Sequence, residues 1–169
     1  SRFGGGNAAA IGNAMSDSGG EMEAGGAIFV HRGSLIAANS TLVENTARGG
    51  RSGLGATAAS GLGGAIFNLS GSVELFNVTI ANNQTTTAAG AEAAKTEGGA
   101  IYNVSMGGAE APNASVKLHN SILAQSQTGS ALAHDLFNDT AHSQGSAVVR
   151  ADDENWIGSV DGAKAIPAQ

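Results

Sequence analysis

The sequence contains no cysteine, which excludes disulfides and metal sites built on thiolates. Only 13% of its residues are charged and only 4% are aromatic, whereas glycine alone supplies 26 positions. Low charge with many small residues is also typical of disordered chains. Here, however, 41% of the residues are apolar and they recur periodically, which favours a folded domain. The 169 residues are enough for one domain with its own core.

Two classes of partner are excluded by the charge and hydropathy of the chain. The net charge is −6, and the eight lysine and arginine residues are scattered, so no basic stripe for nucleic acid is present. No apolar run approaches the roughly 20 residues that a membrane-spanning helix needs. The sequence opens at Ser1 without an initiator methionine or a signal peptide, which indicates a mature, processed or excised chain.

A short motif occurs three times: "GGAIF" at Gly25–Phe29 and Gly63–Phe67, and "GGAIY" at Gly98–Tyr102. Each copy is followed by a second block, "SLIAANSTLVEN", "SVELFNVTIANN" or "SVKLHNSILAQS". Successive copies lie 38 and then 35 residues apart. Self-similarity at such a period indicates an architecture of stacked repeats.

Alignment of the second blocks gives alternating columns of apolar and variable residues. The apolar columns are Leu35, Val73 and Val116; Ala37, Leu75 and Leu118; and Leu42, Ile80 and Leu123. The variable columns between them are Ile36, Glu74 and Lys117, and Ala38, Phe76 and His119. This alternation is the period of a strand with one buried face, not of a helix.

Two polar columns recur at fixed places in the repeat. They are Asn39, Asn77 and Asn120, and Asn45, Asn83 and Ser126. An asparagine at one place in every repeat predicts a buried ladder in which each amide bonds to the next coil. Such a ladder requires parallel, in-register stacking, which is the geometry of a β-solenoid.

Paired glycines precede each repeat, at Gly25–Gly26, Gly63–Gly64 and Gly98–Gly99. They are predicted to lie where the chain turns sharply into a strand, at positive φ or in close contact with another backbone segment. We interpret the small-residue stretches Thr46–Gly61, Thr85–Glu97 and Val104–Ala114 as surface loops inserted at one corner of the coils. The whole chain, 1–169, is then one solenoid domain: an irregular first coil (1–24), three clear repeats (25–126), closing coils (127–158) and a tail (159–169).

The glycine pairs and the "FNVTIANN" spacing resemble the GGAI and FxxN repeats of bacterial polymorphic outer-membrane and autotransporter passenger proteins. More widely, Gly25 to Gly158 resembles the right-handed parallel β-helices of the pectate-lyase-like superfamily. The resemblance implies an all-β, right-handed parallel β-helix of about four to five coils. It also implies an extracellular or cell-surface location. It is specific for architecture and carries no particular activity.

Chemical sites are sparse in the sequence. Enzymes of similar fold place acidic residues of adjacent coils on one face, which makes Asp152, Asp153 and Glu154 candidates together with His134, Asp135 and the nearby Arg150. A solvated charged corner explains the same residues, so no catalytic residue is assigned. The three consecutive acids are weak candidates for calcium, and His31, His119, His134 and His142 lack zinc-site spacing. No cofactor is predicted.

Two other features have a structural and a binding interpretation. Seven N-x-[ST] sequons occur; those at Asn39, Asn77 and Asn83 are expected to be buried in ladders, and those at Asn68, Asn103, Asn113 and Asn138 could be exposed. The aromatic column Phe29, Phe67 and Tyr102 is either core, if it faces inward, or a carbohydrate-binding stripe, if it faces outward. Core is favoured. Trp156 and Ile157 are expected to plug the last coil.

Two functions follow from these features. The first is a non-enzymatic extracellular structural role, as a filament subunit, stalk or adhesin that associates with other copies through the solenoid ends. The alternative is a module that binds or cleaves polysaccharide along one sheet face. Host or matrix glycans are therefore the second class of candidate partner.

Overall fold

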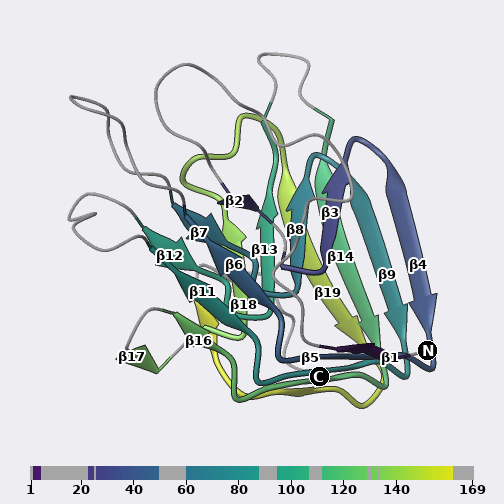
Figure 1. Ribbon diagram of the computed structural model, residues 1–169. Coiled ribbons are helices and arrows are strands. Elements are labelled where there is room, and N and C mark those ends of the chain that lie inside the picture. The colour runs from purple at the N-terminus through teal and green to yellow at the C-terminus, as the bar shows by residue number, and fades with distance from the viewer. Residues whose placement is uncertain are drawn as a thin grey trace.

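The computed structural model describes residues 2–4, 23–24, 26–49, 60–87, 95–106, 112–128, 131–132 and 134–161. All secondary structure in these residues is β-strand, arranged in five sheets. The chain passes from sheet to sheet and returns to each of them one coil later, so that the pairing is parallel except at one strand pair, β16–β17. The fold is therefore a stack of about four coils of a parallel β-solenoid, as the repeats predict (Figure 1).

The two sheets with the longest strands follow one another along the chain in every coil (Figure 1). Sheet D contains β3 (Ile28–His31), β8 (Ile66–Leu69), β13 (Ile101–Val104), β18 (Leu136–Asp139) and β21 (Val160–Asp161). Sheet E contains β4 (Ser34–Ala38), β9 (Ser72–Phe76), β14 (Ala114–His119) and β19 (Ala147–Asp152).

Three sheets of shorter strands complete the coils. Sheet A contains β1 (Arg2–Gly4), β5 (Thr41–Val43), β10 (Thr79–Ala81), β15 (Ile122–Ala124) and β20 (Trp156–Ile157). Sheet B contains β6 (Thr46–Arg48), β11 (Gln84–Thr86), β16 (Gln127–Thr128) and β17 (Ala131–Leu132). Sheet C contains β2 (Glu23–Ala24), β7 (Gly61–Leu62) and β12 (Thr96–Glu97).

Sheets B and C lie partly in segments that the sequence assigns to loops. The expected loops Thr46–Gly61 and Thr85–Glu97 begin and end with the short strands β6, β7, β11 and β12. Two or three residues of Thr, Gly and Gln carry too little hydrophobic pattern to be recognised as strands. Pairing with the neighbouring coil holds them in the sheet.

The strand register reproduces every apolar column that the sequence predicts. Leu35 pairs with Val73 and Val73 with Val116, while Leu42 pairs with Ile80 and Ile80 with Leu123. These columns point inward and form one continuous core along the solenoid axis. Between them Ile36, Glu74 and Lys117 share an outward column on sheet E.

The corners between sheets D and E, between E and A, and between A and B contain non-glycine residues in the left-handed region, and these residues recur at the same place from coil to coil. The corner between sheets E and A has Asn39, Asn77, Asn120 and Asp153, with φ between 47° and 66°. The corner between sheets A and B has Glu44, Asn82 and Gln125. Asparagine tolerates this conformation better than most residues, so backbone geometry accounts for the recurring Asn39 column.

The glycine pairs are explained by two different constraints. Gly63 and Gly98 have φ of 67° and 61°. Their partners approach another coil: a Cβ on Gly26 would lie 1.8 Å from the carbonyl oxygen of Gly64, and one on Gly64 would lie 2.0 Å from that of Gly99. Gly25 lies outside the described residues. The pairs therefore turn the chain and also permit close stacking of coils.

Candidate functional site

A buried column of asparagine amides runs through the interior on sheet D. Asn68, Asn103 and Asn138 are in register and each is 0% exposed. The Nδ2 of Asn68 donates to Oδ1 of Asn103 over 2.7 Å, and the Nδ2 of Asn103 donates to Oδ1 of Asn138 over 2.7 Å. We call these three residues the interior asparagine ladder. Its chain of amides links three successive coils.

The interior asparagine ladder corrects the interpretation of the sequons. The sequence left open that Asn68, Asn103 and Asn138 are exposed, but all three are buried, because they occupy the inward position two residues after Ile66, Ile101 and Leu136. Conversely, Asn39 and Asn77 are exposed at their corner, contrary to expectation. Asn113 is exposed as expected.

The two predicted asparagine columns form ladders of different kinds. Asn45 and Asn83 are buried, and both the backbone nitrogen and the Nδ2 of Asn45 donate to Oδ1 of Asn83 over 2.9 Å. Asn77 donates to Asn39 over 3.3 Å at the surface, and Asn120 of the same column is exposed. The buried pair satisfies interior polar groups, whereas the exposed pair adds little to stability beyond its backbone conformation.

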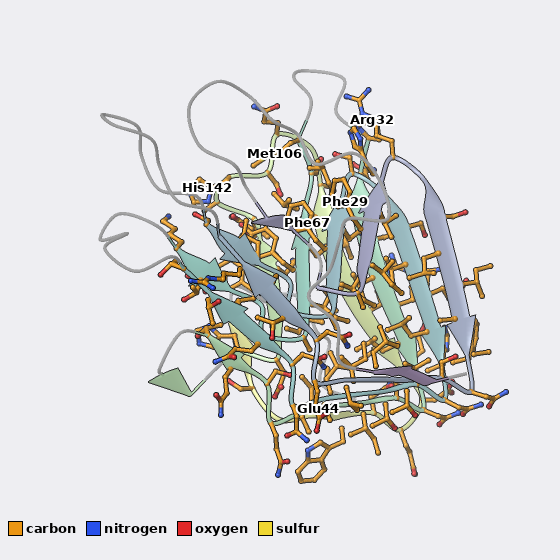
Figure 2. All side chains as sticks on the ribbon, in the orientation of Figure 1. Phe29, Arg32, Glu44, Phe67, Met106 and His142 are labelled. Atoms are coloured by element: carbon orange, nitrogen blue, oxygen red, sulfur yellow. The ribbon has the colours of Figure 1, made fainter. Side chains whose placement is uncertain are left out.

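An aromatic column stands on the other side of sheet D. Phe29, Phe67, Tyr102 and Phe137 stack with ring centroids 5.3–5.4 Å apart, and Figure 2 shows Phe29 beside Phe67. Phe67 is 2% exposed and Tyr102 is 5% exposed. Phe67 and Tyr102 are buried and Phe29 and Phe137 are half-buried, but the column faces away from the axial core instead of into it, since Ile66 and Ile101 on the same strands take the inward positions. It forms a second apolar cluster with Leu62, Leu69 and Val104.

Tyr102 belongs to this second apolar cluster and forms a hydrogen-bonded group with Asp139 and His142. The Tyr102 hydroxyl donates to Asp139, and Nδ1 of His142 lies 2.8 Å from Oδ2 of the same carboxylate. The backbone nitrogen of His142 also donates to Asp139 over 2.9 Å. Burial alone would raise the pKa of Asp139, but the hydrogen bonds from Tyr102 and His142 outweigh it and lower that pKa below its ordinary value. Burial, together with Asp139, raises the pKa of Tyr102 well above its ordinary value.

Tyr102→Phe is expected to change how stability depends on pH at both ends of the scale. Asp139, with a lowered pKa, contributes stability that is present above its unfolded value of 3.8 and is lost as the pH falls through the lower folded value. Tyr102, with a raised pKa, contributes stability that is lost as the pH rises above its unfolded value of 10.0. Without the hydroxyl, acid unfolding should begin at higher pH, and the alkaline loss assigned to this group should disappear. Urea unfolding from pH 3 to 11 checks this; an unchanged pH profile would contradict the assignment.

The outward face of sheet E has one polar contact that joins three coils. His119 stacks on Phe76 with centroids 4.5 Å apart. Its Nε2 lies 3.4 Å from Oε1 of Glu74, and its Nδ1 lies 3.3 Å from Oδ2 of Asp153. Because the two ring nitrogens point to different carboxylates, the three side chains do not surround one point where an ion could sit.

The acidic candidates do not assemble into a site. Asp152, Asp153 and Glu154 are exposed at the corner after β19. Asp135 is buried, where its carboxylate accepts the backbone N–H groups of Ser126 and Ser159 over 2.8 and 3.1 Å. Within the described residues, no three histidine or acidic side chains converge to hold a metal ion. Asp135 therefore serves the backbone of the closing coils.

Trp156 differs from its predicted position. It was expected to plug the last coil, but its side chain is 68% exposed, because it continues the outward column of Thr41, Thr79 and Ile122 on sheet A. Ile122 of the same column is also exposed. Ile157, the next residue, is half-buried and packs against the axial core as expected. An exposed apolar pair therefore stands at the last described strand of sheet A.

The axial core is less enclosed at some positions of its first and last described coils, although Leu42 and Val149 in these coils are 0% exposed. Val73 and Leu75 are 0% exposed, but Leu35 and Ala37, which continue their columns into the first coil, are only half-buried. At the other end Ala151 and Ile157 are half-buried, whereas Leu118 and Leu123 one coil earlier are completely enclosed. Among the described strands, β4 and β19 bound sheet E, and β1 and β20 bound sheet A. We call these two surfaces the first end and the last end; they are the candidate site for an interaction.

Comparisons with protein-family models, with curated proteins and with solved structures find no match. The described residues contain no helix that is long and apolar enough to cross a membrane. The site must therefore be interpreted from its own geometry.

Proposed function

We propose that this chain is a non-enzymatic, extracellular structural module whose solenoid ends stack on other copies of itself, as the subunit of a filament or stalk, including one that acts as an adhesin. The observation that carries the proposal is the state of the axial core. Its columns are fully buried in the middle coils, and they are only half-buried at Leu35 and Ala37 in the first described coil and at Ala151 and Ile157 in the last. Both ends also present strand edges without a described neighbour.

The chemistry of the chain agrees with this role. The interior polar groups form hydrogen bonds between neighbouring coils. These groups are the interior asparagine ladder, the Asn45–Asn83 pair and the buried Asp135. A β-solenoid is a one-dimensional structure in which each coil contacts only its neighbours, and its ends require a cap. A head-to-tail contact between copies supplies that cap at both ends and does not close, so it gives an open filament. The resemblance to bacterial surface β-helices supports the extracellular location.

Ala151→Lys should block assembly, and Val148→Lys should not. Both residues are half-buried on β19, but Ala151 points toward the axial core and Val148 toward solvent, so the pair differs only in the side of the sheet. In a chain that has not assembled, the lysine side chain at position 151 can extend past the last end into solvent. In a stack it would be an unpaired buried charge, so we expect the critical concentration to rise by about a hundredfold, equivalent to about 3 kcal/mol.

The measurement is static light scattering over a concentration series, with circular dichroism to establish that both variants fold. Equal effects of the two lysines on assembly would contradict an interface formed by the core ends. A wild-type chain that stays monomeric at every concentration would remove the proposal. Attention would then move to the alternative, a carbohydrate-binding or polysaccharide-cleaving module, for which the outward face of Phe76, His119 and Glu74 on sheet E is the best surface.

A further inference from the structure

The outward face of sheet A, which runs across the bottom of Figure 1, exposes large apolar side chains in neighbouring coils. Ile122 is 45% exposed and Trp156 is 68% exposed, and the two are register partners on this face. The outward positions of β5, β10, β15 and β20 hold only threonine, valine, alanine, isoleucine and tryptophan. Because the whole chain has a net charge of −6, these uncharged strands form a face on which two copies can meet without repulsion.

Side-chain sizes on this face change in opposite directions along its two outward columns. The first column grows toward the last coil and consists of Thr41, Thr79, Ile122 and Trp156. The second column shrinks in the same direction and consists of Val43, Ala81 and Ala124. Beyond β20 the chain continues through Gly158, which has no side chain on either side of the sheet. Large side chains of one column therefore stand at the level of small ones in the other.

We infer that sheet A is the surface through which two filaments of this chain pair side by side and in parallel; this inference rests on the proposed function. The two filaments are related by a two-fold axis that runs between two sheet A faces, parallel to the solenoid axis. Such an axis keeps the coils level and reverses the strand direction, so the first column of one copy lies on the second column of the other. Ile122 then packs on Ala124 of the other copy, and Trp156 lies at the level of Gly158, where no side chain obstructs its ring.

The antiparallel orientation fits the side chains less well. A two-fold axis parallel to the strands would reverse the order of the coils and place each column on itself. Trp156 would then lie on Thr41, while Gly158 would lie on Val43. One column would be crowded with large side chains and the other would leave a gap, whose lining loses packing contacts. The parallel orientation gives the more even interface, and it also keeps the direction of both filaments the same.

The corners that flank sheet A match in the parallel orientation. The corner between sheets E and A of one copy faces the corner between sheets A and B of the other. The exposed Asn77 comes level with the exposed Asn82, and Glu44 comes level with Asn39. Amides both donate and accept hydrogen bonds, so they suit either partner. The exposed acids that follow β19 are three coils away from Glu44, so none of these acids lies opposite another.

The size of the face explains why this pairing belongs to filaments and not to separate chains. Four strands spaced by about 4.8 Å, each presenting about 10 Å of its length, give a face of about 200 Å² per copy. A stable interface between separate proteins buries about 800 Å² on each partner. One face of sheet A is therefore too small to hold two separate copies together. In two filaments the faces of successive copies act together, because each pair that forms holds the next pair in place.

The number of stacks in a filament tests the inference, since paired stacks have twice the mass per unit length of a single stack. Ala124→Lys places an ammonium group on the second column, where it can extend into solvent in a single stack but would be covered in a pair. Val148→Lys is the matched control, because both residues are half-buried and face outward, but Val148 lies on sheet E. Scanning transmission electron microscopy measures the mass per length. We expect paired stacks for the wild type and Val148→Lys, and single stacks for Ala124→Lys.

Trp156 is the only tryptophan and gives a second readout. Acrylamide should quench its fluorescence more strongly in filaments of Ala124→Lys than in wild-type filaments, because only pairing covers the outward face of sheet A. Wild-type filaments with the mass of a single stack would overturn the pairing and leave the proposed function standing. Paired filaments of Ala124→Lys, no filaments from folded Ala124→Lys, or paired stacks that run in opposite directions would overturn it as well. A wild-type chain that forms no filaments would overturn the pairing and the proposed function together.

Discussion

Gly64→Ala is expected to abolish cooperative folding, or to lower the free energy of unfolding by more than about 4 kcal/mol. The added Cβ would lie 2.0 Å from the carbonyl oxygen of Gly99 and within 3 Å of the backbone of Gln84. All of these are backbone atoms: that of Gly99 belongs to the next coil, and those of Gln84 belong to the opposite side of the same coil. The backbone nitrogen of Gly64 donates to the carbonyl of Gly98 over 3.0 Å, so the coils cannot separate without losing the hydrogen bonds that stack them.

Gly33→Ala is the matched control for this prediction. Its Cβ would meet nothing closer than 3.8 Å, and the residue is exposed at the corner before β4. We expect its effect on the free energy of unfolding to be within about 0.5 kcal/mol. Urea denaturation followed by circular dichroism compares the two variants. A Gly64→Ala variant as stable as Gly33→Ala would mean that the coils do not approach as closely as the structure shows.

Asn103→Leu is expected to lower the free energy of unfolding by about 3 kcal/mol, although it keeps the number and branching of the side-chain heavy atoms. Asn103 is the middle residue of the interior asparagine ladder. Its loss leaves Oδ1 of Asn138 without the donor that lies 2.7 Å away, and removes one acceptor from the Nδ2 of Asn68. A buried polar group without a partner bears its full desolvation cost, which exceeds the net value of the hydrogen bond itself.

Asn77→Gly is the control for the ladder. It removes an exposed amide that donates to Asn39 over 3.3 Å, and glycine keeps the left-handed conformation at φ 53° without strain. Urea denaturation should show a loss of no more than about 0.5 kcal/mol. If Asn103→Leu has an equally small effect, the buried amides do not hold the coils together, and apolar stacking alone must explain the fold.

The coil architecture could be predicted from the sequence because stacking places like residues on like residues. Columns such as Leu42, Ile80 and Leu123 are visible as soon as the repeats are aligned, and each coil in the structure preserves their register. The ends of the short strands in sheets B and C could not be predicted. They have two or three residues each and depend on pairing with another coil for their conformation.

The interior asparagine ladder cannot be recognised from the aligned repeats, because one repeat lacks the asparagine. The interior asparagine ladder begins at Asn68, because the first repeat has Val30 in that position. The Oδ1 of Asn68 consequently has no hydrogen-bond partner. With valine in one repeat, the column does not stand out in the sequence, and each of its asparagines also matches a sequon. The period of the strand could have placed them inside, since they lie two residues after Ile66 and Ile101.

The same parity accounts for the two aromatic differences. Phe67 follows the inward Ile66 and must face outward, and Trp156 precedes the inward Ile157 and must also face outward. The contact between Tyr102 and Asp139 could not be found in this way, because it depends on the path of the corner that carries His142.

Electron microscopy of the purified chain over a concentration series, with helical reconstruction of any filaments, tests the central claim most directly. The proposal predicts filaments in which chains stack head to tail along the solenoid axis, with strands spaced about 4.8 Å along that axis. Particles that remain single chains at all concentrations would contradict the stacking of solenoid ends. Filaments whose subunits are related by a two-fold axis, instead of head to tail, would contradict it equally.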